Sequence, residues 1–187
     1  MKRFIFYITF LVFLFVQSFN AQTKPIELIL NSGDTIKGLG KLKKTFVKYK
    51  KEKKARYTKI DFSKIKTLTV TLKKGYERKY RFLREINQNK LLPLEEIISG
   101  NLSLYIIHST SFGGNGITQS FADYYLIKDS DTKVTHFGSS ELISTKFNKI
   151  AKKYFSDCKS LLDKLESKVF RKKDIMKIVE YYNEKCK

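Results

Sequence analysis

The chain has few of the side chains that metal and cofactor sites use. Its 187 residues include two histidines, two cysteines and no tryptophan. His108 and His136 are accompanied by no HExxH motif, no Cys–His cluster and no carboxylate-rich loop. The sequence therefore predicts neither a metal site nor a bound cofactor.

The sequence also lacks a motif for a catalytic nucleophile. His108 and Ser109, with Asp123 as a third member, invite comparison with a hydrolase triad. Ser109 lies outside any G-x-S-x-G turn, and neighbouring side chains on a strand point to opposite faces. Glu95 and Glu96 are adjacent, so on a strand they diverge and make a poor acid–base pair. We therefore expect a protein that is not an enzyme.

Glycine is scarce and clusters in Gly-Gly-Asn-Gly at 113–116. A phosphate-binding loop would continue with Lys-Ser or Lys-Thr and then a helix, and neither follows here. We expect a loop over residues 111–120, which is a candidate contact loop or lid.

Long apolar runs are absent except at the N-terminus. Lys2 and Arg3 precede an apolar run over 4–16, interrupted only by Thr9. A membrane-spanning helix needs about 20 apolar residues, so this run is typical of a cleaved secretory signal. We predict a signal peptide over residues 1–21 and export from the cytoplasm. Cleavage after Ser18 and an uncleaved anchor are the alternatives.

The two cysteines, Cys158 and Cys186, allow one intramolecular pairing. Export supplies an oxidising compartment, so we predict a structural disulfide between them. Closing a loop of about 29 residues gives roughly 3.6 kcal/mol of stabilisation in the chain-entropy expression. Redox or metal-binding thiols are the alternative, and they would need a CxxC spacing or nearby histidine ligands, which the sequence lacks.

Acidic residues are too few to balance the basic ones. The chain has 38 Lys and Arg against 18 Asp and Glu, and residues 37–90 alone hold 20 basic against 4 acidic residues. Such a field attracts polyanions, here anionic lipid or acidic polysaccharide, since export argues against nucleic acid as the natural partner. The residues expected at a polyanion contact are Lys43, Lys44, Lys48, Lys50, Lys51, Lys53, Lys54 and Arg56.

A second interpretation of this charge stays open. Only six basic residues are Arg, the residue that planar phosphate recognition favours. Lysine is also a common solvated residue on edge strands, where it prevents sheet-to-sheet aggregation. The interleaved run Tyr76, Arg78, Tyr80, Arg81 and Phe82 is equally open: it can stack sugars or bases, or form a strand with one buried aromatic face.

Alternating apolar residues predict an α+β fold, with an antiparallel β-rich body over 22–138 that forms a small barrel followed by hairpins. Pro93 indicates an edge strand or a strand end. From Ser139 the spacing becomes helical, and residues 139–187 are expected to form about three helices packed on the sheet, with Asp157 and Asp174 as N-caps. The strands are expected at residues 26–30, 35–40, 45–50, 57–62, 65–72, 76–86, 91–98, 102–109, 121–128 and 133–137.

Four short stretches carry a resemblance to other proteins: 19–22 (Phe-Asn-Ala-Gln), 30–38 (Leu-Asn-Ser-Gly-Asp-Thr-Ile-Lys-Gly), 99–105 (Ser-Gly-Asn-Leu-Ser-Leu-Tyr) and the tail 154–186. With these the chain resembles a group of secreted proteins of Bacteroidetes-type bacteria for which no activity is established. The resemblance implies export to the periplasm or the cell exterior of a Gram-negative bacterium, and it carries over no site residue.

Export, the lack of a catalytic constellation and the aromatic-rich strands favour a non-catalytic binding protein of the cell envelope. Its expected partner is an unidentified protein or a polymer of the envelope.

Overall fold

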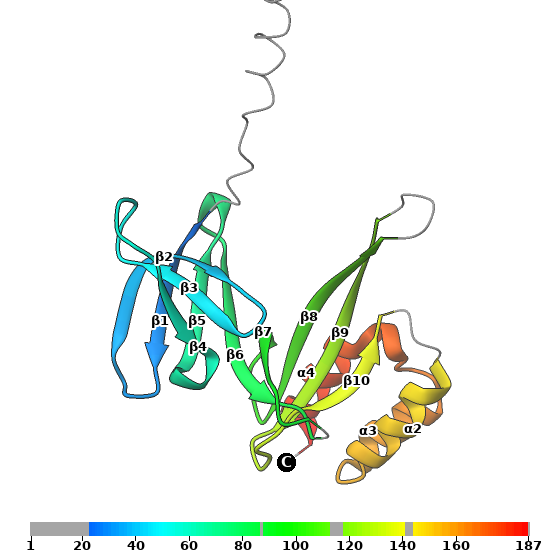
Figure 1. The fold of residues 1–187 in the computed structure, drawn as a ribbon. Coiled ribbons are helices and arrows are strands. Elements are labelled where there is room, and N and C mark those ends of the chain that lie inside the picture. Colours follow the sequence, from blue (N-terminus) through cyan, green and yellow to red (C-terminus); the bar gives the residue numbers. More distant parts are fainter. Residues whose placement is uncertain (1–22, 87, 113–117, 141–143, 187) are drawn as a thin grey trace, which may run out of the picture.

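The fold is an open antiparallel sheet followed by helices. The computed structural model describes residues 23–86, 88–112, 118–140 and 144–186; the predicted signal peptide lies outside this part. The ten strands in it are ordered β10-β9-β8-β7-β6-β5-β1-β2-β3-β4 (Figure 1). This confirms the α+β class. The strands are β1 (Lys24–Leu30), β2 (Thr35–Leu42), β3 (Phe46–Lys50), β4 (Thr58–Asp61), β5 (Ile65–Thr71), β6 (Glu77–Arg84), β7 (Leu91–Ile98), β8 (Leu102–Phe112), β9 (Thr118–Lys128) and β10 (Thr135–Ser139).

The sheet does not close into the small barrel that the sequence suggested. After β4 the chain passes through the short helix η1 (Phe62–Lys64) into β5. β5 then pairs with β1 rather than with β4, in a register that joins Leu28 to Leu68. Because the sheet grows from the other side of β1, β4 is left as one edge and β10 as the other.

The N-terminal half of the sheet, β1–β6, curls around its own core. Alternate residues of β1, Ile26 and Leu28, are buried with Val47 of β3 and Leu68 of β5. Gly40 of β2 leaves room for this packing, because a Cβ there would overlap the Cδ1 of Ile26. The core of this half therefore depends on a close approach between β1 and β2.

The helices cover one face of the C-terminal strands. They are α2 (Ser144–Tyr154), α3 (Lys159–Glu166) and α4 (Ile175–Lys185), close to where the periodicity predicted them. Among the described residues, none of the helices is long and apolar enough to span a membrane. The core between sheet and helices includes Leu102, Leu104, Leu126, Phe137, Phe147, Phe155, Leu161 and Ile178.

A second cluster lies on the opposite face of β7–β9. Tyr105 and Tyr125 face each other across β8 and β9 and are buried with Leu94 and Val134. Val134 precedes β10 and forms an isolated bridge with Glu85 at the end of β6. The C-terminal half of the sheet is thus packed on both faces.

Cys158 and Cys186 form the predicted disulfide, with their Cα atoms 5.4 Å apart. The bridge joins the residue before α3 to the residue after α4, so it fastens the two ends of the helical hairpin together. A disulfide indicates an oxidising, exported location.

Asp157 does not cap α3 as the sequence suggested. The N-cap position is held by Cys158. The Asp157 carboxylate instead accepts hydrogen bonds from the Lys128 Nζ at 2.8 Å and the Tyr182 hydroxyl at 2.6 Å, which tie β9 to α4. Asp174 stands at the N-cap position of α4, but its carboxylate accepts a hydrogen bond from the Arg171 backbone at 3.0 Å.

β7 is an interior strand and not an edge strand, but Pro93 is its third residue and so lies near a strand end, the other position expected from the sequence. β7 pairs with β6 from Leu91 to Glu95 and with β8 from Glu95 to Ile98. The ladder between β7 and β8 does not reach Pro93, so the missing N–H of proline interrupts no bond on that side. β7 therefore changes partner at Glu95.

The predicted loop over 111–120 is shorter than expected. β8 runs to Phe112 and β9 begins at Thr118, and Ser111 is paired with Gln119. The glycines at 113, 114 and 116 lie outside the described residues.

Candidate functional site: a cationic cleft

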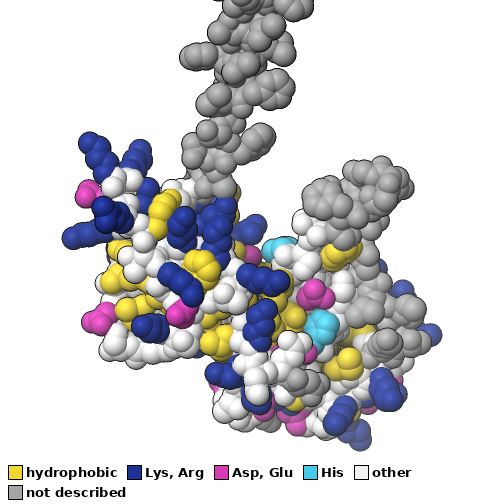
Figure 2. All heavy atoms as spheres, viewed as in Figure 1, with side chains coloured by type: hydrophobic (Ala, Val, Ile, Leu, Met, Phe, Trp, Pro, Cys, Tyr) yellow, Lys and Arg dark blue, Asp and Glu magenta, His cyan; other side chains and the backbone are white. Residues whose placement is uncertain are grey.

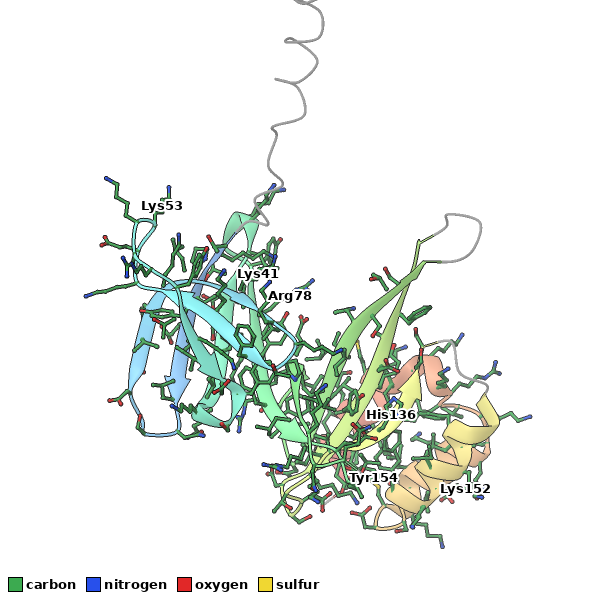
Figure 3. The ribbon with its side chains drawn as sticks, viewed as in Figure 1. Lys41, Lys53, Arg78, His136, Lys152 and Tyr154 are labelled. Atoms are coloured by element: carbon green, nitrogen blue, oxygen red, sulfur yellow. A yellow bond between two sulfur atoms is a disulfide. The ribbon has the colours of Figure 1, made fainter. Side chains whose placement is uncertain are left out.

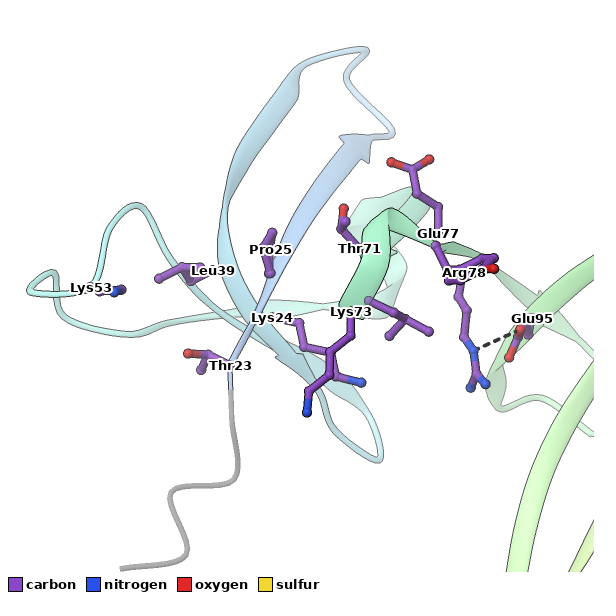
Figure 4. A pocket seen from close by; sticks show the side chains of 12 residues that line it. Thr23, Lys24, Pro25, Leu39, Lys53, Thr71, Lys73, Glu77, Arg78 and Glu95 are labelled. Atoms are coloured by element: carbon purple, nitrogen blue, oxygen red, sulfur yellow. Dashed lines mark ion pairs between the residues drawn. The ribbon is translucent and has the colours of Figure 1, made fainter.

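A cleft of about 1360 Å³ lies at one end of the N-terminal half of the sheet (Figure 4). Its walls come from the start of β1, from β2, from the turn between β3 and β4, from the end of β5 with the turn that follows it, from the start of β6 and from β7. We name it the cationic cleft. It is lined by Thr23, Lys24, Pro25, Leu39, Lys53, Thr71, Leu72, Lys73, Tyr76, Glu77, Arg78 and Glu95.

The apolar part of the wall follows from strand pairing and from a tight turn. Pro25 of β1 is directly opposite Leu39 of β2. Between β5 and β6 the chain reverses through Lys74 and Gly75, with φ angles of 63° and 77°. The Leu72 N–H donates to the Tyr76 carbonyl at 2.6 Å and closes this turn. The Lys-Lys-Gly turn therefore places a lysine and a tyrosine on the same rim.

Three cleft lysines, Lys24, Lys53 and Lys73, are exposed and come from three separate segments. Among the described residues, none of them has a carboxylate oxygen within 4 Å. Their charges are therefore available to a ligand.

The eight basic residues proposed from the sequence gather in the same half of the molecule. Figure 2 shows Lys and Arg side chains concentrated there, and Figure 3 labels Lys53 at the turn between β3 and β4. Lys53 lines the cleft; Lys51, Lys54 and Arg56 are exposed on the same turn. The others lie on β3 (Lys48 and Lys50) and on the turn before it (Lys43 and Lys44).

Aromatic contacts keep part of this charge together. The Nζ atoms of Lys48 and Lys50 lie 4.1 and 4.8 Å from the ring centroid of Tyr57. The Lys50 Nζ also donates to the Lys53 carbonyl at 2.6 Å. The face of an aromatic ring attracts cations, so Tyr57 offsets part of the repulsion between the two lysines.

Glu95 lies where β7 leaves β6 for β8, and its side chain is 12% exposed. Its carboxylate lies 3.4 Å from the Arg78 Nε and 3.8 Å from the His108 Nε2, and the Tyr80 hydroxyl donates to it at 3.4 Å. Burial and the charge of Glu95 raise the pKa of Tyr80. The change of strand partner thus assembles a polar group from three strands.

Glu96 lies on the opposite face and pairs with Lys79 at 2.7 Å, so the two glutamates diverge as predicted. Adjacent positions on a strand make Glu95 and Glu96 a poor acid–base pair, and this signal does not distinguish one from the other. The alternation of side chains along a strand shows that the two glutamates point to opposite faces, but it does not identify an ion-pair partner for either of them.

A smaller cavity of about 220 Å³ adjoins the cleft. The two share Lys24, Leu72 and Arg78, and the smaller one adds Lys41. The basic surface is therefore continuous from one to the other.

The residues considered for a triad are not brought together. Asp123 is opposite Ile107 in the ladder of β8 and β9, so it lies on the face away from His108. The Asp123 carboxylate instead pairs with the His136 Nε2 at 3.3 Å. His108 faces Glu95, whereas Ser109 lies on the other face of the sheet, the face of Asp123.

The described side chains contain no group of three or more His, Cys, Asp or Glu that could hold a metal ion. The arrangement offers fixed positive charge beside apolar surface, which is the chemistry of binding an anion. A comparison of the chain with protein-family models, with curated proteins and with solved structures found no match.

Proposed function

We propose that this protein is an exported binding protein of the cell envelope that holds an anionic polymer in the cationic cleft. The observation that carries the proposal is that Lys24, Lys53 and Lys73 line one concave surface and have no carboxylate partner among the described residues. A concave surface lined by one sign of charge focuses its field and concentrates oppositely charged ligands.

The two carboxylates of the cleft do not cancel this field. Glu95 is paired with Arg78 at 3.4 Å, so that pair is close to neutral. Glu77 stands alone against the three lysines. The wall therefore keeps a positive balance where a ligand would lie.

The disulfide supports an exported location. We propose more narrowly the periplasm or the exterior of a Gram-negative bacterium, on the strength of the signal peptide predicted over 1–21 and of the resemblance to secreted proteins of Bacteroidetes-type bacteria. We also propose a non-catalytic role, supported by the separation of His108 from Asp123.

A charge-matched pair of triple variants tests the cleft. Lys24→Gln/Lys53→Gln/Lys73→Gln removes the cleft lysines, and Lys149→Gln/Lys159→Gln/Lys177→Gln removes the same charge from exposed positions on α2–α4. Binding of dextran sulfate is measured by titration calorimetry at low and high NaCl, with neutral dextran as the blank.

The cleft variant should lose at least about tenfold in affinity, while the helix variant stays close to wild type. Binding should weaken sharply with salt, because the Debye length falls to about 8 Å at physiological ionic strength. Equal losses in the two variants, or binding that is insensitive to salt, would contradict the proposal.

Adsorption to anionic lipid is a second candidate, favoured by the exposed turn between β3 and β4 with Lys51, Lys54 and Arg56. Each basic residue near an anionic membrane contributes about 1 kcal/mol. The variant Lys51→Gln/Lys54→Gln/Arg56→Gln leaves the cleft lining intact. Cosedimentation with phosphatidylglycerol vesicles should fall for this variant if the turn adsorbs to lipid, and stay unchanged if it does not.

A further inference from the structure

We infer that the occupant of the cationic cleft is an acidic polysaccharide, with a sugar ring stacked on Tyr76 and its acidic groups held by Lys24 and Lys73. This inference rests on the proposed function and names the ligand class of the same site. It starts from an aromatic side chain that binding by charge alone would not need.

Tyr76 lines the cleft beside Lys73 and leaves 70% of its surface exposed. Its backbone carbonyl is fixed by the Leu72 N–H, so the turn holds the residue at the rim. The face of an aromatic ring carries partial negative charge. It therefore attracts the polarised C–H face of a pyranose ring, and such stacking needs an accessible ring.

The positions of the three lysines suit a ligand whose negative charges are spaced along its length. Figure 4 shows Lys24 and Lys73 pointing the same way from β1 and from the turn between β5 and β6. Lys53 adds a third positive charge from another segment. An acidic polysaccharide carries a charge on successive rings, which fits three separate ammonium groups.

A single compact phosphate fits the cleft less well. Planar, bidentate recognition of phosphate favours arginine. The arginine of the cleft, Arg78, is already paired with Glu95 through its Nε. The volume of about 1360 Å³ also exceeds the roughly 300–1,000 Å³ of most small-molecule sites.

Single-stranded nucleic acid and a membrane are the competing polyanions. Grooves for single strands stack successive bases on several aromatic rings, whereas Tyr76 is the one aromatic among the described cleft residues. The disulfide indicates an exported location, away from cellular nucleic acid. A flat bilayer does not enter a concave wall, so lipid headgroups would meet the rim and not Leu39 and Pro25.

The experiment uses the mature chain and five probes of similar length or charge. They are hexagalacturonate, a heparin-derived hexasaccharide, neutral maltohexaose, linear polyphosphate and the oligonucleotide dT6; phosphatidylglycerol vesicles form a separate arm. Each is titrated against wild type, Tyr76→Ala, Tyr76→Phe and the control Met176→Ala. Met176 is also a large exposed apolar side chain, but it lies on α4 and outside the cleft lining.

One or both acidic oligosaccharides should bind, and maltohexaose should not. Tyr76→Ala should weaken this binding about tenfold, which corresponds to about 1.4 kcal/mol. Tyr76→Phe keeps the ring and should remain within about threefold of wild type, as should Met176→Ala. Polyphosphate has no ring to stack, so its binding should be the same for wild type and Tyr76→Ala.

The remaining outcomes separate the two proposals. If polyphosphate binds as tightly as the acidic oligosaccharides and Tyr76→Ala changes neither, anion binding stands and the ligand class is wrong. Tighter binding of dT6 or of the vesicles would also overturn the ligand class. If no anionic probe binds, the proposed function fails together with this inference.

Discussion

The side-chain amide of Asn183 is hydrogen-bonded to both backbone polar groups of Leu102. The Leu102 N–H donates to the Asn183 Oδ1 at 2.7 Å, and the Asn183 Nδ2 donates to the Leu102 carbonyl at 2.9 Å. The last helix thus continues the hydrogen bonding of the sheet at the first residue of β8. Gly100 makes room for it, because a Cβ there would lie 2.7 Å from the Asn183 Nδ2.

Asn183→Ala should lower the free energy of unfolding by about 1–3 kcal/mol, because it leaves the backbone groups of the buried Leu102 without these partners. Urea unfolding measures the change, and Asn148→Ala on the exposed side of α2 is the control. Gly100→Ala should displace the same amide, so the double variant Gly100→Ala/Asn183→Ala should lose less than the sum of the two. Additive losses would show that the two residues act independently.

Removing the Cys158–Cys186 bridge should destabilise the fold by about 3–4 kcal/mol. The bridge restricts the conformations of the unfolded chain. In the folded protein it joins the residue before α3 to the residue after α4. Cys158→Ala/Cys186→Ala should show this loss in urea unfolding, and dithiothreitol should produce a similar loss in wild type. A thiol assay that found two free thiols in the exported protein would contradict the bridge.

Protonation of the Asp157 carboxylate should lower the free energy of unfolding at acid pH. Burial alone would raise the pKa of Asp157, but the hydrogen bonds from Lys128 and Tyr182 and the charge of Lys128 hold the pKa below its ordinary value. A carboxyl with a lowered pKa stabilises the fold above its unfolded pKa of about 3.9, and this is lost as pH falls through the folded value.

Asp157→Asn should therefore cost a roughly constant amount above about pH 5 and almost nothing at the acid end, relative to wild type. The side chain is 49% exposed, so the constant cost should be about 1 kcal/mol or less. Urea unfolding between pH 2 and pH 7 measures it. A cost independent of pH over that range would rule out the ion pair as its cause.

The hydroxyl of Tyr125 should ionise at a higher pH than that of an ordinary tyrosine. Burial, with the charges of Asp123 and Glu85, raises the pKa of Tyr125 to about 12. A group whose pKa is raised on folding contributes stability that is complete below its unfolded pKa of about 10, and that is lost as pH rises to about 12. Absorbance at 295 nm should show fewer late-ionising tyrosines in Tyr125→Phe, and its stability should decline less between pH 10 and pH 12. An unchanged titration curve would place Tyr125 among the ordinary tyrosines.

Glu95→Gln should strengthen anion binding severalfold. The change removes a negative charge from the cleft wall and weakens the hold on Arg78, whose guanidinium then faces the ligand. Glu180→Gln removes the same charge from an exposed position on α4 and is the control. Dextran sulfate titration of both variants should separate them; equal affinities would show that Arg78 takes no part in binding.

The secondary structure was largely readable from the sequence because alternation and helical spacing are local. The apolar pattern over 91–98 predicted β7 with its observed bounds, and the Thr-rich run predicted β5 to within a residue. The open sheet was not readable, because it depends on β5 pairing with β1, more than 30 residues away. The roles of Asp157 and Glu95 could not be predicted for the same reason, because their hydrogen-bond and ion-pair partners come from other strands and helices.

The sequence by itself determined where strands and helices form, that two cysteines have one way to pair, and that residues 37–90 carry most of the charge. Backbone preference and side-chain periodicity act over a few residues, so these features need no knowledge of the fold. Only the tertiary structure decided that Lys24, Lys53 and Lys73 share one concave wall with Tyr76, and that Arg78 is held by Glu95. Electrostatic neighbours are set by how distant strands pack, and residue order alone does not specify that packing.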